Sequence, residues 1–209
     1  MKIDTRLYFI TDSTDYGEEF LYRIEEALKG GVTIVQLREK AKSTREYIEL
    51  AHKVHELTRR YDVPLIIDDR ADVALAVNAE GVHLGQSDMT VYMAREIMGA
   101  DKIIGATAKT VEQGVEAYRQ GADYLGVGAI FPTTTKVRTV LTSVATLEDI
   151  CRNVPIPVNA IGGLNKDNIG ALKGVPISGI CAVSAIMKSD NPRQAVQDID
   201  KAGRGYGLW

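Results

Sequence analysis

The feature that most constrains the fold is an eightfold alternation of short apolar segments with longer amphipathic ones. Most of the apolar segments are continuous runs rich in Val, Ile and Leu. Continuous runs are typical of strands that parallel neighbours and helices cover on both faces. We therefore expect strands at 7–10, 33–37, 65–67, 81–84, 103–106, 124–127, 158–161 and 179–183.

The segments between these strands carry helix signals. Ser43-Thr44-Arg45-Glu46 is a capping box, and an apolar stripe with helical spacing follows it through Tyr61. The pattern at Thr110 repeats the cap, and Gly30-Gly31 and Gly121 end helices before the next strand. Further helices are expected over 18–29, 90–98, 147–152 and 191–202.

Strand followed by helix, eight times, predicts a single α/β domain over residues 1–209, a closed (β/α)8 TIM barrel. The alternative is an open Rossmann-like sheet. That fold calls for a glycine-rich turn after the first strand, but Thr11-Asp12-Ser13-Thr14 stands there and no G-x-G-x-x-G occurs. With 209 residues, each unit has about 26, which is compact for a barrel.

Composition excludes several classes of function. The chain has 25 Lys+Arg against 28 Asp+Glu, a net charge of −3, so no overall basic field attracts nucleic acid or an anionic membrane. Cys151 and Cys181 are too few for a disulfide framework or a cysteine zinc site. No signal-peptide core or apolar run of roughly 18 residues occurs. We expect a cytoplasmic protein that binds small molecules, with neither nucleic acid nor membrane as a partner.

Polar residues gather after the expected strands, at the end of a barrel where catalytic groups lie. Alternation along the second strand sends Gln36, Arg38 and Lys40 to one side. Asp69 and Asp88 follow neighbouring strands, so they are expected to share a hard cation. Mg²⁺ suits this pair because it takes one or two carboxylates together with phosphate oxygens of a substrate. Each aspartate alone is also compatible with capping the next helix.

Two anion sites are expected at this rim. Arg38, Lys40 and Lys136 would surround a diphosphate with positive charge. A second site, in the region where such barrels often bind phosphate, would use the hydroxyls of 133–135 and the backbone near Gly163 and Ser184. The Gly162-Gly163 pair alone would equally suit a tight turn. About ten residues from 136 to 145 show no clear pattern and predict a long loop of the kind that covers or binds ligands.

The three histidines do not suggest catalysis. We expect His52 and His55 on the exposed face of their helix, and His83 as a structural residue that forms hydrogen bonds. No Ser/His/Asp or Cys/His nucleophile pattern stands out.

The chain resembles the thiamine phosphate synthase family nearly from end to end. The blocks that carry the resemblance, in matching order and spacing, are 8–12, 31–40, 81–88, 121–128, 132–136, 160–163 and 182–185. The family joins an aminopyrimidine, carried as its methyl diphosphate, to a thiazole phosphate and releases pyrophosphate. The C–O bond to the diphosphate breaks first, and the thiazole nitrogen captures the resulting carbocation.

The resemblance implies residue roles. Mg²⁺ would be bound by Asp69 and Asp88. Arg38, Lys40 and Lys136, with Thr107, would be the catalytic residues, because charge on the departing pyrophosphate needs stabilising. The pyrimidine diphosphate would contact Gln36, Leu37, Arg38, Glu39, Lys40, Asp68, Thr107 and Lys136. The thiazole phosphate would contact Thr133, Thr134, Thr135, Gly163, Val183 and Ser184.

Three positions depart from the family pattern. Asp68 stands where Asn is usual, and a carboxylate adds negative charge beside a diphosphate and cannot donate a hydrogen bond. Thr107 replaces Ser and keeps the hydroxyl. Residues 137–146 lack the Gly and Pro expected after the Thr-x-Thr-Lys motif.

Other functions compete with synthesis. Thiazole tautomerases are a sister branch of the fold with a His two positions after the residue matching Thr107, where this chain has Lys109. A non-catalytic barrel that senses thiamine phosphate is another alternative, and the Asp68 substitution leaves it open. A Schiff-base aldolase would use Lys40 or Lys136. If the protein assembles, we expect a homodimer, and no sequence signal locates its interface.

Overall fold

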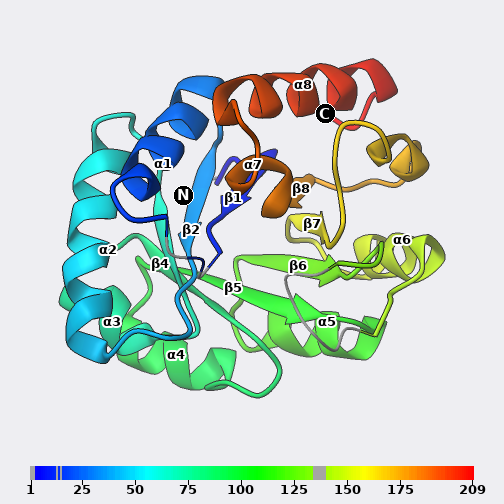
Figure 1. Ribbon diagram of the computed structural model, residues 1–209. Coiled ribbons are helices and arrows are strands. Elements are labelled where there is room, and N and C mark those ends of the chain that lie inside the picture. Colours follow the sequence, from blue (N-terminus) through cyan, green and yellow to red (C-terminus); the bar gives the residue numbers. More distant parts are fainter. Residues whose placement is uncertain (1–2, 13, 15, 134–139) are drawn as a thin grey trace.

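The eight expected strands form one closed parallel barrel in the computed structural model, which describes residues 3–12, 14, 16–133 and 140–209 (Figure 1). Strands pair in chain order, and the first and last close the ring with Phe9 opposite Ala182. The predicted (β/α)8 barrel is thereby confirmed. The strands are β1 (Leu7–Ile10), β2 (Ile34–Leu37), β3 (Leu65–Asp68), β4 (Gly81–Leu84), β5 (Ile103–Ala108), β6 (Tyr124–Gly128), β7 (Val158–Ile161) and β8 (Gly179–Ala182).

Helices surround the barrel (Figure 1). Hydroxyl side chains begin several of them: Ser43, Thr90, Thr110 and Ser143 each accept a backbone N–H of the first turn. The helices are α1 (Glu19–Gly30), α2 (Thr44–Arg59), α3 (Ala71–Ala76), α4 (Val91–Met98), α5 (Val111–Arg119), α6 (Val144–Asn153), α7 (Ser184–Met187) and α8 (Pro192–Tyr206), with a 3-10 turn at Ile169–Leu172. None among the described residues is long and apolar enough to span a membrane.

The sequence missed the short helices and misplaced two helix boundaries. Helices α3 and α7 have six and four residues, too few to show a helical period. Helix α6 begins at Val144 behind its Ser143 cap, so the loop expected to reach 145 ends earlier. Helix α8 continues through Gly203 to Tyr206. This glycine serves packing and does not end the helix: the Trp209 ring lies against it, and a Cβ at this position would lie 2.0 Å from the ring.

The expectation that His55 lies on an exposed helix face is wrong. Its side chain is buried, with Nδ1 3.1 Å from the Val77 carbonyl oxygen and Nε2 3.1 Å from Glu80 Oε1. The inner face of α2 is wider than the apolar stripe suggests, since it also covers the chain between α3 and β4. His52 is exposed, as expected.

Two separate cores support the barrel. One lies between the sheet and the helices, and the other fills the barrel interior with Tyr8, Ile10, Ile34, Ile66, Ile103, Tyr124 and Cys181. A glycine makes room for the largest interior side chain: a Cβ on Gly105 would lie 2.1 Å from the Tyr124 ring. The interior is therefore filled in the middle of the barrel, and the cavity lies above this core, at the carboxyl ends of the strands.

Candidate active site

A cavity at the carboxyl ends of the strands brings together most of the predicted site residues that the structure describes. Gln36 and Arg38 reach it from β2, Asp68 from β3 and Thr107 from β5. The other predicted residues that line it are Thr133, Gly163, Val183 and Ser184. Side chains contributed by strands far apart in the sequence thus meet at one mouth, as the barrel topology requires.

Some predicted site residues lie elsewhere. The Leu37 side chain is buried in the outer core, between the sheet and the helices. Glu39 folds back on its own loop, where it accepts hydrogen bonds from the backbone N–H groups of Lys40 and Ala41 at 2.9 and 3.2 Å. Neither side chain lines the cavity, because strand alternation turns both away from it. Thr134, Thr135 and Lys136 lie outside the described residues.

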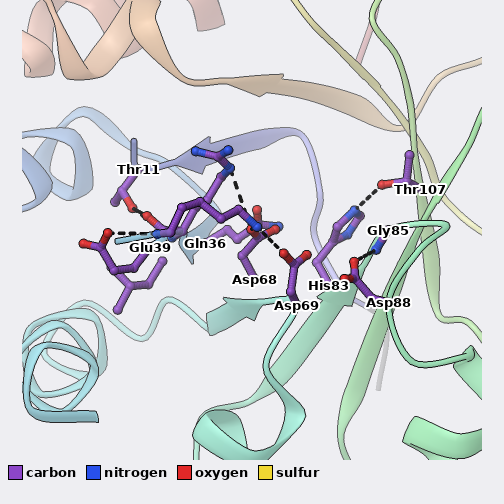
Figure 2. A network of polar contacts seen from close by, with 12 residues as sticks. Thr11, Gln36, Glu39, Asp68, Asp69, His83, Gly85, Asp88 and Thr107 are labelled. Carbon is purple, nitrogen blue, oxygen red and sulfur yellow. Dashed lines mark hydrogen bonds and ion pairs between the residues drawn. The ribbon is translucent and has the colours of Figure 1, made fainter. Parts of the chain in front are cut away.

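A cluster of opposite charges lies on one side of the mouth (Figure 2). Lys40 Nζ is 2.7 Å from Asp68 Oδ2 and also pairs with Asp69. Arg38 Nε lies 3.7 Å from the same Asp68 oxygen. Asp69 has a φ of 61°, in the left-handed region that costs most residues free energy and that Asp tolerates better than most. The loop after β3 thus accepts backbone strain to bring two adjacent carboxylates to the rim.

The acidic groups crowd one another. Burial, and then the charge of Asp69, raise the pKa of Asp68 despite its lysine and arginine neighbours. Burial also raises the pKa of Asp88, and the neighbouring Asp69 raises it further. A hydrogen bond from the Gly85 N–H to Asp88 Oδ2, 2.7 Å long, lowers the same pKa, but the net shift is upward. For Lys40, burial lowers the pKa, but Asp68 and Asp69 together outweigh burial, so the net shift is upward.

Crowded carboxylates are the chemistry that a hard cation relieves, so Asp69 and Asp88 fit Mg²⁺. Within the part of the chain that the structure describes, no group of three or more His, Cys, Asp or Glu residues could hold a metal. Mg²⁺ does not require such a group, because substrate phosphates and water complete its shell. The residues present suit a metal that arrives with a phosphorylated ligand.

Two residues that sequence reasoning did not place in the site hold the strand ends. Thr11 Oγ1 accepts the Arg38 N–H at 3.0 Å, which ties the end of β1 to the end of β2. Tyr47, on the inner face of α2, donates to the carbonyl oxygens of Leu37 at 2.7 Å and Asp68 at 3.4 Å. Helical spacing identified Tyr47 only as an apolar position, and its hydroxyl gave no separate signal.

A chain of hydrogen bonds, here called the interior chain, crosses the barrel beneath the cavity. Gln36 Nε2 donates to the Tyr8 hydroxyl at 2.8 Å, and the Tyr8 and Tyr124 hydroxyls are 2.6 Å apart. His83 Nδ1 is 3.1 Å from the Tyr124 hydroxyl, and its Nε2 is 3.0 Å from Thr107 Oγ1. Figure 2 shows the end of this chain at His83 and Thr107. The expectation that His83 forms hydrogen bonds is confirmed, whereas Tyr8 and Tyr124 were missed.

The opposite side of the mouth is built from backbone. Gly162 and Gly163 have φ values of 101° and 65°. A Cβ on Gly162 would lie 2.5 Å from Ala129 Cα, and one on Gly163 would lie 2.6 Å from the Pro132 carbonyl oxygen. The glycine pair is therefore a tight turn that also lets the β6 and β7 loops touch. Beside this close approach lies an open recess whose polar groups include the side chains of Thr133, Asn165 and Ser184.

Comparisons with known proteins agree on one family. The family model described as thiamine monophosphate synthase matches residues 7–186. Thiamine-phosphate synthase 2 of Streptococcus pneumoniae is 51% identical over 187 residues, 89% of each chain. Thiamine-phosphate synthase of Methanobrevibacter smithii is 47% identical over 199 residues, 95% of each chain. The solved thiamine phosphate pyrophosphorylase of Pyrococcus furiosus superimposes with a TM-score of 0.88 at 40% identity, covering 97% of both chains.

Proposed function

The chain belongs to the thiamine monophosphate synthase family, and from this premise we propose how its barrel mouth divides two substrates between two sides. Members of the family form thiamine phosphate from a pyrimidine and a thiazole moiety, so the chain is a transferase of thiamine biosynthesis that acts on small molecules. The proposal concerns the residues, the metal and the order of events. The observation that carries it is the meeting of Arg38 and Lys40 with three aspartates on one side of the mouth.

The charged side would bind the diphosphate of the aminopyrimidine. Arg38 offers a planar group for phosphate oxygens, and Lys40 offers a mobile point charge. Lys136 would add a third cation from the loop after β6. Gln36 and Thr107, which line the deeper part of the cavity, would contact the pyrimidine ring.

Mg²⁺ would be held by Asp69 and Asp88. It would supply charge neutralisation to the diphosphate as that group leaves. Arg38 and Lys40 would stabilise the same leaving group from the protein side, because their charges are fixed before the C–O bond breaks. The reaction then needs no protein nucleophile.

The backbone side would bind the thiazole phosphate. Thr133, Gly163, Val183 and Ser184 line that part of the cavity, and Thr134 and Thr135 would join them. A single phosphate is smaller and less charged than a diphosphate, so a recess of hydroxyls and N–H groups suffices. The two reactants would then meet between the sides, with the thiazole nitrogen facing the pyrimidine methylene carbon.

The alternatives lack supporting observations. An aldolase needs an unprotonated lysine, but Asp68 and Asp69 hold Lys40 in a charged pair and its net pKa shift is upward. A tautomerase of the sister branch would carry a histidine where Lys109 lines the cavity. We also propose the cytoplasm as the compartment, where the free thiols of Cys151 and Cys181 would stay reduced.

A coupling assay tests the proposal. The purified protein, mixed with the pyrimidine diphosphate, the thiazole phosphate and Mg²⁺, should release pyrophosphate and thiamine phosphate in equal amounts. Asp88→Ala should abolish this turnover, whereas Asp101→Ala, an exposed position before β5 at the other end of the barrel, should leave it intact. A folded protein that binds both substrates without turnover would support the sensor instead. Normal turnover by Asp88→Ala would refute the metal assignment.

A further inference from the structure

We propose that the interior chain runs in one direction, fixes His83 as the tautomer with its proton on Nε2, and thereby presents the Thr107 hydroxyl as a hydrogen-bond donor to a ring nitrogen of the pyrimidine. This inference rests on the proposed function and adds two positioning residues, Tyr8 and Tyr124, to it. The evidence is the sequence of donors and acceptors along the chain.

The direction begins at Gln36. Its Nε2 can only donate, so the Tyr8 oxygen accepts at 2.8 Å. Both phenols keep their protons, because burial raises the pKa of Tyr8 and of Tyr124 well above the ordinary value. Each phenol therefore has one proton to give. Tyr8 gives its proton across the 2.6 Å contact to the Tyr124 oxygen.

The direction continues through the imidazole. Since the Tyr124 oxygen already accepts from Tyr8, its own proton is available for His83 Nδ1, 3.1 Å away. A neutral imidazole has one donor and one acceptor nitrogen, and the partner of the first nitrogen decides the second. With Nδ1 accepting, Nε2 carries the proton and donates to Thr107 Oγ1 over 3.0 Å.

The last proton in the series faces the cavity. Thr107 Oγ1 accepts from His83, and in the described part of the chain no other residue forms a hydrogen bond to this hydroxyl. Thr107 lines the cavity, so its O–H is left to donate to a ligand. An aminopyrimidine has ring nitrogens that accept and an exocyclic amine that donates. The Thr107 proton needs an acceptor, and on the pyrimidine a ring nitrogen can accept it, whereas the exocyclic amine is a donor.

Packing holds the chain in register. A Cβ on Gly105 would lie 2.1 Å from the Tyr124 ring, and one on Gly126 would lie 3.2 Å from His83 Cε1. The Tyr8 and Tyr124 rings meet edge to face, with centroids 5.6 Å apart. Rings packed this closely cannot rotate away to change partners. The packing therefore fixes the partner of each hydroxyl, and the donor at Gln36 then sets the direction.

Nitrogen NMR of the imidazole rings tests the direction without using turnover. The chain has only three histidines, so His83→Gln assigns the His83 signals by their loss. Long-range ¹⁵N–¹H spectra of the metal-free protein near neutral pH should show His83 with a protonated Nε2 and a bare Nδ1. A protonated Nδ1, or protons on both nitrogens, would overturn the inference whether or not the protein proves to be a synthase.

Two variants test whether Gln36 sets the direction. Gln36→Glu replaces the donor with an acceptor, so the protons should reverse and His83 should carry its proton on Nδ1. Tyr124→Phe removes the donor to Nδ1 with no change of charge and should leave a mixture of tautomers. In Tyr124→Phe, which does not touch the proposed substrate contacts, the KM for the pyrimidine diphosphate should rise about three- to tenfold, the span of one hydrogen bond, while the KM for the thiazole phosphate stays unchanged. A single unaltered tautomer in both variants would contradict the proposal.

Substrate analogues test the ring nitrogen. Pyrimidine diphosphates in which one ring nitrogen is replaced by C–H should include one that the wild type binds about three- to tenfold more weakly. Thr107→Val should not distinguish that analogue from the parent compound, and Thr107→Ser should again distinguish them. Equal discrimination by wild type and Thr107→Val would show that the hydroxyl donates elsewhere and would refute the assignment. If the wild type fails to couple the parent substrates at all, the proposed function fails while the NMR result stands.

Discussion

At the scale of single residues, the site depends on how much negative charge Asp68 adds beside a diphosphate. Its carboxylate is buried, lies 2.7 Å from Lys40 Nζ and lies 3.7 Å from Arg38 Nε. Both cations are the ones that we propose for the diphosphate. Asp68 therefore partly neutralises the groups that the substrate needs, while it also keeps them at the rim when no ligand is bound.

Replacing this carboxylate should strengthen substrate binding. In Asp68→Asn the charge is lost and the shape is kept, so Arg38 and Lys40 are left to the diphosphate. The removed charge already pairs with two cations beside the solvent-filled cavity, so its loss is worth on the order of 1 kcal/mol, or about fivefold in affinity. Steady-state kinetics should show a KM for the pyrimidine diphosphate lowered by about this factor. Asp101→Asn is the matched control at an exposed position, and an equal KM in wild type and Asp68→Asn would contradict the expected role.

The same variant should change how stability depends on pH. Burial, followed by the charge of Asp69, raises the folded-state pKa of Asp68 above the ordinary value of 3.8. Between these two pKa values the folded state binds more protons than the unfolded state, so wild-type stability falls as pH rises through this window. Asp68→Asn has no carboxyl group at this position, so its free energy of unfolding does not fall with pH for this reason. Urea unfolding in EDTA should show the variant gaining stability relative to wild type from about pH 4 upward, and a constant difference would contradict the shift.

At the scale of elements, an arginine on α1 supports the segment that we propose for the thiazole phosphate. Arg23 Nη1 donates to the carbonyl oxygens of Met187 and Ser189 at 3.1 and 2.9 Å, at the end of α7. Its guanidinium also stacks on Tyr16, 5.0 Å from the ring centroid. These bonds satisfy carbonyl groups that a short helix leaves open. Arg23 thereby fixes where the chain around Ser184 lies.

Loss of this support should affect one substrate only. Arg23→Met should raise the KM for the thiazole phosphate several-fold and leave the KM for the pyrimidine diphosphate unchanged. Arg95→Met is the matched control, because Arg95 likewise donates to backbone carbonyls, those of Gly99, Lys102 and Gly121, but at the other end of the barrel. Equal changes in both KM values, or the same change in the control, would show only general destabilisation.

Elements also show what the sequence could predict. The sequence predicts all eight strands because runs such as Leu65–Ile67 are continuously apolar, and it predicts capped helices such as Thr44–Arg59 because their ends carry recognisable residues. Helix α7 was missed because four residues hold no period. The contact between Tyr8 and Tyr124 joins positions 116 residues apart. No local sequence pattern indicates such a pairing, so the interior chain could be identified only from the three-dimensional structure of the closed barrel.

At the scale of the whole molecule, the closed barrel should gain stability from its ligands. Anything that binds only the folded state raises stability, by about 2.7 kcal/mol at a concentration 100 times its Kd. For a chain of this size that corresponds to a rise in Tm of about 5 to 10 °C. Thermal unfolding should show this rise with Mg²⁺ and pyrophosphate together. Asp88→Ala should remove it, and an undiminished rise in that variant would show that pyrophosphate binds without the proposed metal pair.

Closure of the ring through β1 and β8 also bears on how the protein is made. A ribosome delivers the chain from its N-terminus, so the proposed charged side is complete once Lys136 has emerged and the backbone side only once Ser184 has. The mouth between them exists only after β8 has docked against the strand that was synthesised first. Substrate binding consequently cannot stabilise an incomplete chain. It stabilises only molecules whose synthesis is complete and whose barrel has closed.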